Sequence, residues 1–131
     1  MAKTDREEYA LAGGMPPISH YTDAVRFGNL LFISGLAPVD AEMKLVSPDV
    51  VEQTRSLFEQ MEKLLSAAGA TFADVLRVTV YLTDVNDRTK INPVRQEFFG
   101  STRPASTLIG VNELAIPGMK VEIEAIAGLP R

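Results

Sequence analysis

Apolar residues recur with the period of an α-helix in the middle of the chain. Between residues 50 and 68 they fall three or four positions apart, so they share one face of a helix. These residues are Val50, Leu57, Phe58, Met61, Leu64, Leu65 and Ala68. Ser47 can cap the helix, Pro48 suits its first position, Asp49 suits the positive end of its dipole, and Gly69 suits its C-terminal end. The pattern predicts an amphipathic helix whose apolar face lies in the core.

Five other segments alternate apolar and polar residues or are apolar throughout, which predicts β-strands. They are residues 24–27, 30–37, 74–83, 105–111 and 120–127. Gly28-Asn29, between the first two segments, is a typical two-residue hairpin turn. In the segment 74–83 we expect one apolar and one polar face. The apolar face holds Leu76, Val78, Val80 and Leu82, and the polar face holds Arg77, Thr79 and Tyr81.

A second helix is expected within residues 84–99, where Ile91, Val94 and Phe98 share one side. Pro93 marks either its first turn or a kink, because proline inside a helix removes a backbone hydrogen bond. Residues 1–19 are polar and then rich in glycine and proline, which predicts an extended N-terminal arm with little regular structure.

The order of these elements predicts one α+β domain over residues 1–131, a sandwich with two helices on one face of a sheet. Met43–Val46 favours one further short strand. The run Leu30–Ile33 is apolar on both faces, and we expect Leu108 and Ile126 to add apolar side chains to the face without helices. A sheet that is apolar on both faces is normally covered on both. Since no third layer is predicted, further copies of the chain are the expected cover.

Composition narrows the function classes. Apolar residues make up 46% and charged residues 23% of the chain, a balance typical of a globular domain. A net charge of −4 argues against a general phosphate-binding surface, and thus against nucleic acid as a partner. The absence of cysteine excludes disulfides, and a single histidine disfavours a conventional zinc site. No segment is long and apolar enough to predict a membrane span, and the polar start predicts no secretory signal. We therefore expect a cytoplasmic protein without a metal.

Two carboxylates share one face of the last predicted strand. Glu122 and Glu124 are two residues apart, while the residues that alternate with them are apolar. Burial and a second carboxylate would both raise the pKa of Glu122, which favours a general base. The alternative is structural: Arg77 or a backbone N–H could pair with either glutamate.

Eight short motifs together resemble the RidA/YjgF family of enamine/imine deaminases. They are His20–Val25, Phe32–Gly35, Gln53–Arg55, Val78–Thr83, Asn92, Phe98–Gly100, Pro104-Ala105 and Glu122–Ala127. The resemblance spans the chain from about residue 18 onward. It implies a chorismate-mutase-like α+β fold with a mixed sheet, a homotrimer whose sheets line a central barrel, and small-molecule clefts between subunits. It implies no cofactor.

The resemblance also implies site residues. In related deaminases a glutamate of the last strand positions the water that attacks the imine, and it corresponds to Glu122. A tyrosine and a Ser-Gly backbone element frame the cleft, and they correspond to Tyr21 and to Ser34 and Gly35. Asn92 matches a further polar position. His20 adjoins Tyr21, and we expect it to be an exposed loop residue.

This chain departs from the family pattern at Ser106, where deaminating relatives have an arginine that binds the substrate carboxylate. A bidentate guanidinium–carboxylate contact contributes about 1.5–3 kcal/mol, so its loss weakens binding about 10- to 100-fold. Arg103 precedes Pro104 and is a poor substitute from its spacing. We therefore expect a neutral or cationic ligand, or one that hydrogen-bonds Ser106.

Three functions are compatible with these observations. The first is hydrolysis of small enamines or imines with altered substrate preference. The second is non-catalytic binding of a small molecule or a chaperone-like role. The third is the ribonuclease activity attached to some relatives, which the acidic net charge disfavours.

Overall fold

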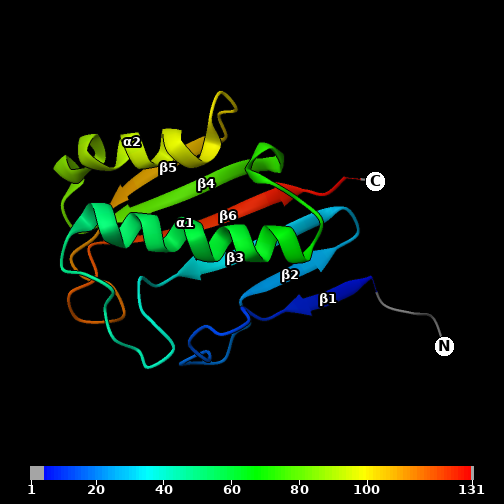
Figure 1. The fold of residues 1–131 in the computed structure, drawn as a ribbon, viewed down its shortest axis with the longest axis horizontal. Helices are drawn as coiled ribbons and strands as arrows, with labels where there is room; N and C mark the ends of the chain where they lie inside the picture. The colour runs from blue at the N-terminus through cyan, green and yellow to red at the C-terminus, as the bar shows by residue number, and fades with distance from the viewer. Residues whose placement is uncertain (1–4, 131) are drawn as a thin grey trace.

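The computed structural model describes residues 5–130 and shows one layer of two helices on one six-stranded sheet (Figure 1). The strands are β1 (Arg6–Tyr9), β2 (Ala24–Phe27), β3 (Leu30–Leu36), β4 (Val75–Leu82), β5 (Ala105–Gly110) and β6 (Val121–Gly128). The helices are α1 (Val50–Ala67) and α2 (Arg88–Phe99), and two short 3-10 helices, η1 (Phe72–Asp74) and η2 (Val85–Asp87), precede β4 and α2. Among the described residues, no helix is long and apolar enough to cross a membrane.

The sheet is open and mixed, with the order β1-β2-β3-β6-β4-β5. β4 and β5 run parallel, and every other pair of neighbours is antiparallel. The parallel pair needs a crossover connection, which α2 provides. The predicted fold class, an α+β sandwich with two helices on one face of a mixed sheet, is confirmed.

The core lies between α1, α2 and the covered face of the sheet. The side chains predicted to face inward on α1 are buried, as are the alternate residues of β6 (Val121, Ile123, Ala125 and Ala127). At one end of this core four phenylalanine rings, those of Phe58, Phe72, Phe98 and Phe99, pack edge-on or tilted against one another. Their packing fixes the C-terminal end of α2 against α1.

The ends of α1 differ in part from the prediction. The N-cap is Asp49, whose side chain accepts a hydrogen bond from the backbone N–H of Glu52, so Pro48 lies before the helix and not at its first position. Ser47 supports the cap, since its Oγ accepts the backbone N–H of Asp49. The C-terminal signal is confirmed: the helix ends at Ala67, and Gly69 adopts a positive φ of 77°.

The N-terminal arm contains a strand that the sequence did not predict. Residues 6–9 form β1 and pair with β2 at the edge of the sheet, so this part of the arm is regular. The tetrapeptide Arg-Glu-Glu-Tyr has no alternation, and backbone pairing with a free strand edge forms it. Residues 1–4 of the predicted arm lie outside the described residues.

The predicted strand at Met43–Val46 is absent. A single bridge joins Val39 and Leu45. Asp40 accepts the backbone N–H groups of Glu42 and Lys44, and Met43 has a φ of 66°. These local bonds make a tight turn in place of a strand.

Two apolar side chains lie on faces other than those predicted. The register between β4 and β6 shifts between Val75 and Arg77, and this irregularity turns Leu76 to the face without helices: Leu76 is 53% exposed, whereas Val75 is 3% exposed. Leu108 does the reverse. It lies beside Val80 in the parallel pair and packs against the core, because β5 presents it to the helix layer.

The face without helices carries exposed apolar side chains beside a group of polar ones. Phe27, Phe32, Leu76 and Ile109 are exposed on it, and Ile126 is half-buried, as expected of a surface that another molecule covers. The polar group is Thr79, Tyr81, Glu122 and Glu124, in register across β4 and β6.

Candidate active site

A cleft of about 330 Å³ lies beside Glu122, and we call it the Glu122 cleft. It unites four of the residues expected to form the site, which come from β6, β3 and the segment before β2: Glu122, Ser34, Gly35 and Tyr21. Seven further residues line it: Met15, Ile18, Ser19, Ala37, Ala115, Ile116 and Met119. Most of them are apolar, so a carboxylate stands in a largely apolar cleft.

Gly35 fixes the position of the Glu122 carboxylate. A Cβ at residue 35 would lie 2.6 Å from Oε2 and 2.8 Å from Cδ of Glu122. The register between β3 and β6 also shifts between Ile33 and Leu36, so Ser34 and Gly35 stand at an irregularity in the ladder. Such irregularities are common beside active sites, because they free backbone groups from regular pairing.

Ser34 ties the segment that carries Tyr21 to the sheet. Its Oγ donates a hydrogen bond of 2.6 Å to the carbonyl of Thr22, and its backbone N–H donates one of 2.9 Å to the carbonyl of Asp23. Asp23 in turn accepts the backbone N–H of Leu11 at 2.7 Å. Tyr21 is thereby held at the rim of the cleft, while its ring remains exposed. His20 is exposed as expected and does not line the cleft.

The loop that contributes Ala115, Ile116 and Met119 to the cleft is fixed by Gln53, a fully buried amide on α1. Its Nε2 donates hydrogen bonds of 3.0 Å to the carbonyls of Ser47 and Gly118, and its Oε1 accepts the backbone N–H of Lys120 at 2.8 Å. These bonds hold residues 115–119, which border the cleft, against α1. The sequence offered one signal for this role: Gln53 is a polar residue beside the apolar face of the predicted helix.

Burial in the cleft raises the pKa of Glu122, and the negative charge of Glu124 raises it further. Glu124 accepts a 2.8 Å hydrogen bond from the Tyr81 hydroxyl, which raises the pKa of Tyr81. The alternative pairing with Arg77 is not formed among the described residues, since Arg77 donates to Oγ1 of Thr107 at 2.5 Å. Glu122 therefore keeps a carboxylate with a raised pKa and no cationic partner in the described part of the chain.

Asn92 and Ser106 lie away from Glu122 within one chain. Ser106 is in register with the buried Val78, so it lies on the helix side of the sheet, whereas Glu122 lies on the other side. Oγ of Ser106 accepts a hydrogen bond of 3.0 Å from Nη2 of Arg95, a residue of α2 that sequence reasoning missed. One signal was available: Arg95 is three residues after Asn92, on the same face of a helix.

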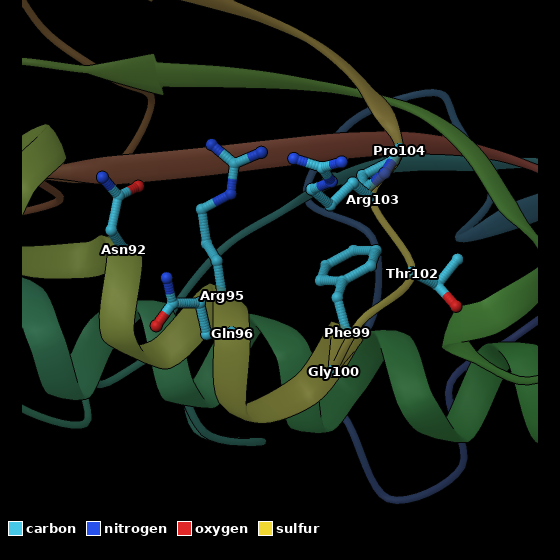
Figure 2. Close-up of a pocket in the computed structure, with 8 residues that line it drawn as sticks. All are labelled: Asn92, Arg95, Gln96, Phe99, Gly100, Thr102, Arg103 and Pro104. Atoms are coloured by element: carbon cyan, nitrogen blue, oxygen red, sulfur yellow. The ribbon is translucent and has the colours of Figure 1, made fainter.

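Asn92 and Arg95 line a second cavity of about 290 Å³, which we call the Arg95 cavity (Figure 2). It lies between α2 and the loop that leads to β5, and its other lining residues are Gln96, Phe99, Gly100, Thr102, Arg103 and Pro104. Arg103 thus shares a cavity with Arg95, although its spacing from position 106 had made it a poor candidate for the site. Burial lowers the pKa of Arg95, because it disfavours the charged guanidinium.

Comparison with known proteins places this geometry in a family. The sequence model of the family described as Endoribonuclease L-PSP matches residues 13–129. A RutC family protein from Pyrococcus horikoshii is 43% identical over 112 residues, 85% of this chain and 88% of the relative. A 2-iminobutanoate/2-iminopropanoate deaminase from Salmonella typhimurium is 35% identical over 130 residues, 97% of this chain and 98% of the relative.

A solved structure has the same fold. The crystal structure of Escherichia coli TdcF with bound serine superposes with a TM-score of 0.86 at 31% identity, covering 95% of this chain and 99% of TdcF. The match extends over nearly all of both chains, and the motifs of the Glu122 cleft are present. The chain therefore belongs to the RidA/YjgF (Rid) family, with serine at position 106, where the resemblance implied an arginine.

Proposed function

We propose that this protein hydrolyses small imines, and the enamines that tautomerise to them, to carbonyl compounds and ammonia in the Glu122 cleft. The observation that carries the proposal is the Glu122 carboxylate: it has a raised pKa, faces a largely apolar cleft and is seated against the backbone of Gly35. A carboxylate with a raised pKa is suited to both accept and return a proton.

The proposed reaction balances with water as the single co-reactant. Water adds to the carbon of the C=N bond while Glu122 accepts one of its protons. Glu122 returns that proton to nitrogen, which gives a carbinolamine, and then transfers the hydroxyl proton of the carbinolamine to the same nitrogen. The C–N bond breaks, and ammonia leaves as the carbonyl group forms. We propose that backbone groups of Ser34 and Gly35, where the ladder is irregular, form polar contacts to the reacting group. Tyr21 is proposed to cover the rim of the cleft.

The cleft is proposed to be completed by other copies of the chain. The exposed apolar side chains on the face without helices support a homotrimer in which the sheets face one another. Such an assembly could bring Asn92 and Ser106 of one copy toward Glu122 of the next, which a single chain does not. Light scattering after size exclusion measures this directly: three times the mass of the chain is expected, and a monomer would contradict it. A cytoplasmic location also remains a prediction.

Relatives support a small-molecule ligand. One is named a 2-iminobutanoate/2-iminopropanoate deaminase, and the TdcF structure holds serine. The name of the matching family mentions an endoribonuclease, but the net charge of −4 disfavours RNA as a substrate here.

The test is ammonia release from a panel of freshly generated imines, with spontaneous hydrolysis subtracted. Removal of a general acid–base group slows reactions about 10²- to 10⁴-fold, so Glu122→Gln should lower kcat by at least about 100-fold. Glu62→Gln, which removes an exposed carboxylate of α1, is the matched control and should retain the wild-type rate. Equal rates for wild type and Glu122→Gln would refute the proposal.

One observation favours a second candidate, a non-catalytic small-molecule-binding or chaperone-like protein. Ser106 removes a family contact to substrate while the cleft itself persists. Binding of an imine analogue without ammonia release by wild type would select this candidate.

A further inference from the structure

Two guanidinium groups share the Arg95 cavity, and neither has a carboxylate partner among the described residues. Figure 2 shows Arg95 and Arg103 extending to the same side of α2, one from the helix and one from the loop after it. Among residues 5–130 neither forms an ion pair, and the one hydrogen bond of Arg95 is to the neutral Ser106 hydroxyl. No carboxylate in the described part of the chain lines the cavity, although the chain has 17 acidic and 13 basic residues.

Arg95 is also held in position. Its side chain is half-buried, and the bond to Ser106 Oγ aims one edge of the guanidinium toward β5. A cation removed from water without a partner is unfavourable, and an anion in the cavity would relieve this. The planar guanidinium presents two parallel N–H groups, which match a carboxylate or a phosphate.

The rest of the lining narrows the ligand. The Asn92 amide adds hydrogen-bonding capacity, whereas Phe99 and Pro104 present apolar surface beside the two arginines. A volume of about 290 Å³ is at the small end for ligand sites, which favours a ligand of a few carbon atoms. A charged head beside an apolar wall matches an organic acid better than inorganic phosphate, which has no apolar part.

We propose that the Arg95 cavity is a binding site for small organic carboxylates, in which Arg95 and Arg103 bind the carboxylate and Phe99 and Pro104 contact a short hydrocarbon chain. The site goes beyond the proposed hydrolysis and stands whether or not Glu122 turns over a substrate. It competes with the expectation of a neutral or cationic ligand, which rested on the missing arginine at position 106.

The experiment is isothermal titration calorimetry of the full-length protein with three probes: butanoate, its neutral analogue butanamide, and inorganic phosphate. Butanoate should bind, and butanamide and phosphate should each bind at least about 10-fold more weakly. Butanamide lacks the negative charge, and phosphate lacks the hydrocarbon chain. Equal binding of phosphate and butanoate would overturn the assignment to organic acids. Failure of butanoate to bind at millimolar concentrations would overturn the site.

Variants locate the binding. Arg95→Gln and Arg103→Gln should each weaken butanoate binding at least about 10-fold, and Arg95→Lys should restore part of the affinity. Arg88→Gln removes a positive charge from the same helix outside the cavity, where Arg88 bonds the carbonyl of Val85, and should bind as wild type does. Circular dichroism checks folding, and Arg103→Gln, in a loop, keeps the test available if Arg95→Gln does not fold. Unchanged binding in both glutamine variants would overturn the proposal.

Discussion

The Glu122 cleft and the Arg95 cavity differ in the sign of their charge and in how that charge is held. Glu122 is packed against Gly35 beside a second carboxylate, on the sheet face without helices. Arg95 lies on the helix side with Arg103, and a serine hydroxyl orients it. One sheet thus keeps a carboxylate and two guanidinium groups apart within a single chain. Separation of the two prevents Glu122 from forming an ion pair that would lower its pKa.

Among the variants that test this difference between the two regions, Gly35→Ala should have the largest effect, a loss of activity. The new Cβ would stand 2.6 Å from Oε2 of Glu122 and displace the carboxylate, and a misplacement of about 1 Å can lower a rate about 100-fold. Ammonia-release kinetics should show this loss.

Gly128→Ala is the matched control, because its Cβ would meet only the flexible end of Leu76 at 3.3 Å. If Gly35→Ala were as active as Gly128→Ala, residue 35 would not determine the position of the Glu122 carboxylate.

A smaller effect is expected from Gln53→Ala, which frees the loop on one side of the Glu122 cleft. Loss of the buried amide leaves the backbone N–H of Lys120 and two carbonyls without their partner, at about 1–3 kcal/mol of unfolding free energy. Urea denaturation measures this difference.

Gln60→Ala on the same helix should cost less, because Gln60 is half-buried and bonds one backbone carbonyl, that of Ala37. An equal loss in the two variants would contradict the role given to Gln53.

The smallest effect is a change in pH dependence with Glu124→Gln. Protonated Glu122 cannot accept a proton from water, so activity should fall as pH decreases through its raised pKa. Removal of the Glu124 charge lowers that pKa and should move the acidic limb of the pH–rate profile to lower pH. An unchanged profile would show that Glu124 does not act on Glu122.

The raised pKa of Glu122 should also make the stability of the fold depend on pH. Because the pKa of Glu122 is raised, the folded state binds more protons than the unfolded state between the unfolded and folded pKa values. The contribution to stability is therefore present at low pH and is lost as pH rises through the folded pKa. Glu124→Gln should reduce this loss, as measured by unfolding at several pH values.

Local patterns were sufficient to predict α1, the hairpin at Gly28-Asn29 and the side of β6 that carries Glu122, because periodicity alone determines which face a residue takes. The face of Leu76 could not be predicted, since it depends on an irregular register with β6. β1 depends on backbone pairing with a distant strand edge.

The Arg95 cavity was out of reach for a related reason. Arg95 meets Ser106 because the crossover from α2 to β5 turns residues 100–104 back along the helix, and no local pattern encodes that contact. The net charge of −4 is a sum over the whole chain, so it does not reveal that two arginines line one cavity. The absence of arginine at position 106 predicted that this region lacks a positive charge. Arg95 of α2, which bonds Ser106, provides that charge.

The most direct test of this division is a calorimetric titration of butanoate into Glu122→Gln and Arg95→Gln, compared with wild type. The two regions are predicted to respond in opposite ways. Glu122→Gln should bind butanoate as tightly as wild type or more tightly, because a negative charge is removed, and Arg95→Gln should bind at least about 10-fold more weakly. Loss of binding in Glu122→Gln to the same extent as in Arg95→Gln would contradict the account.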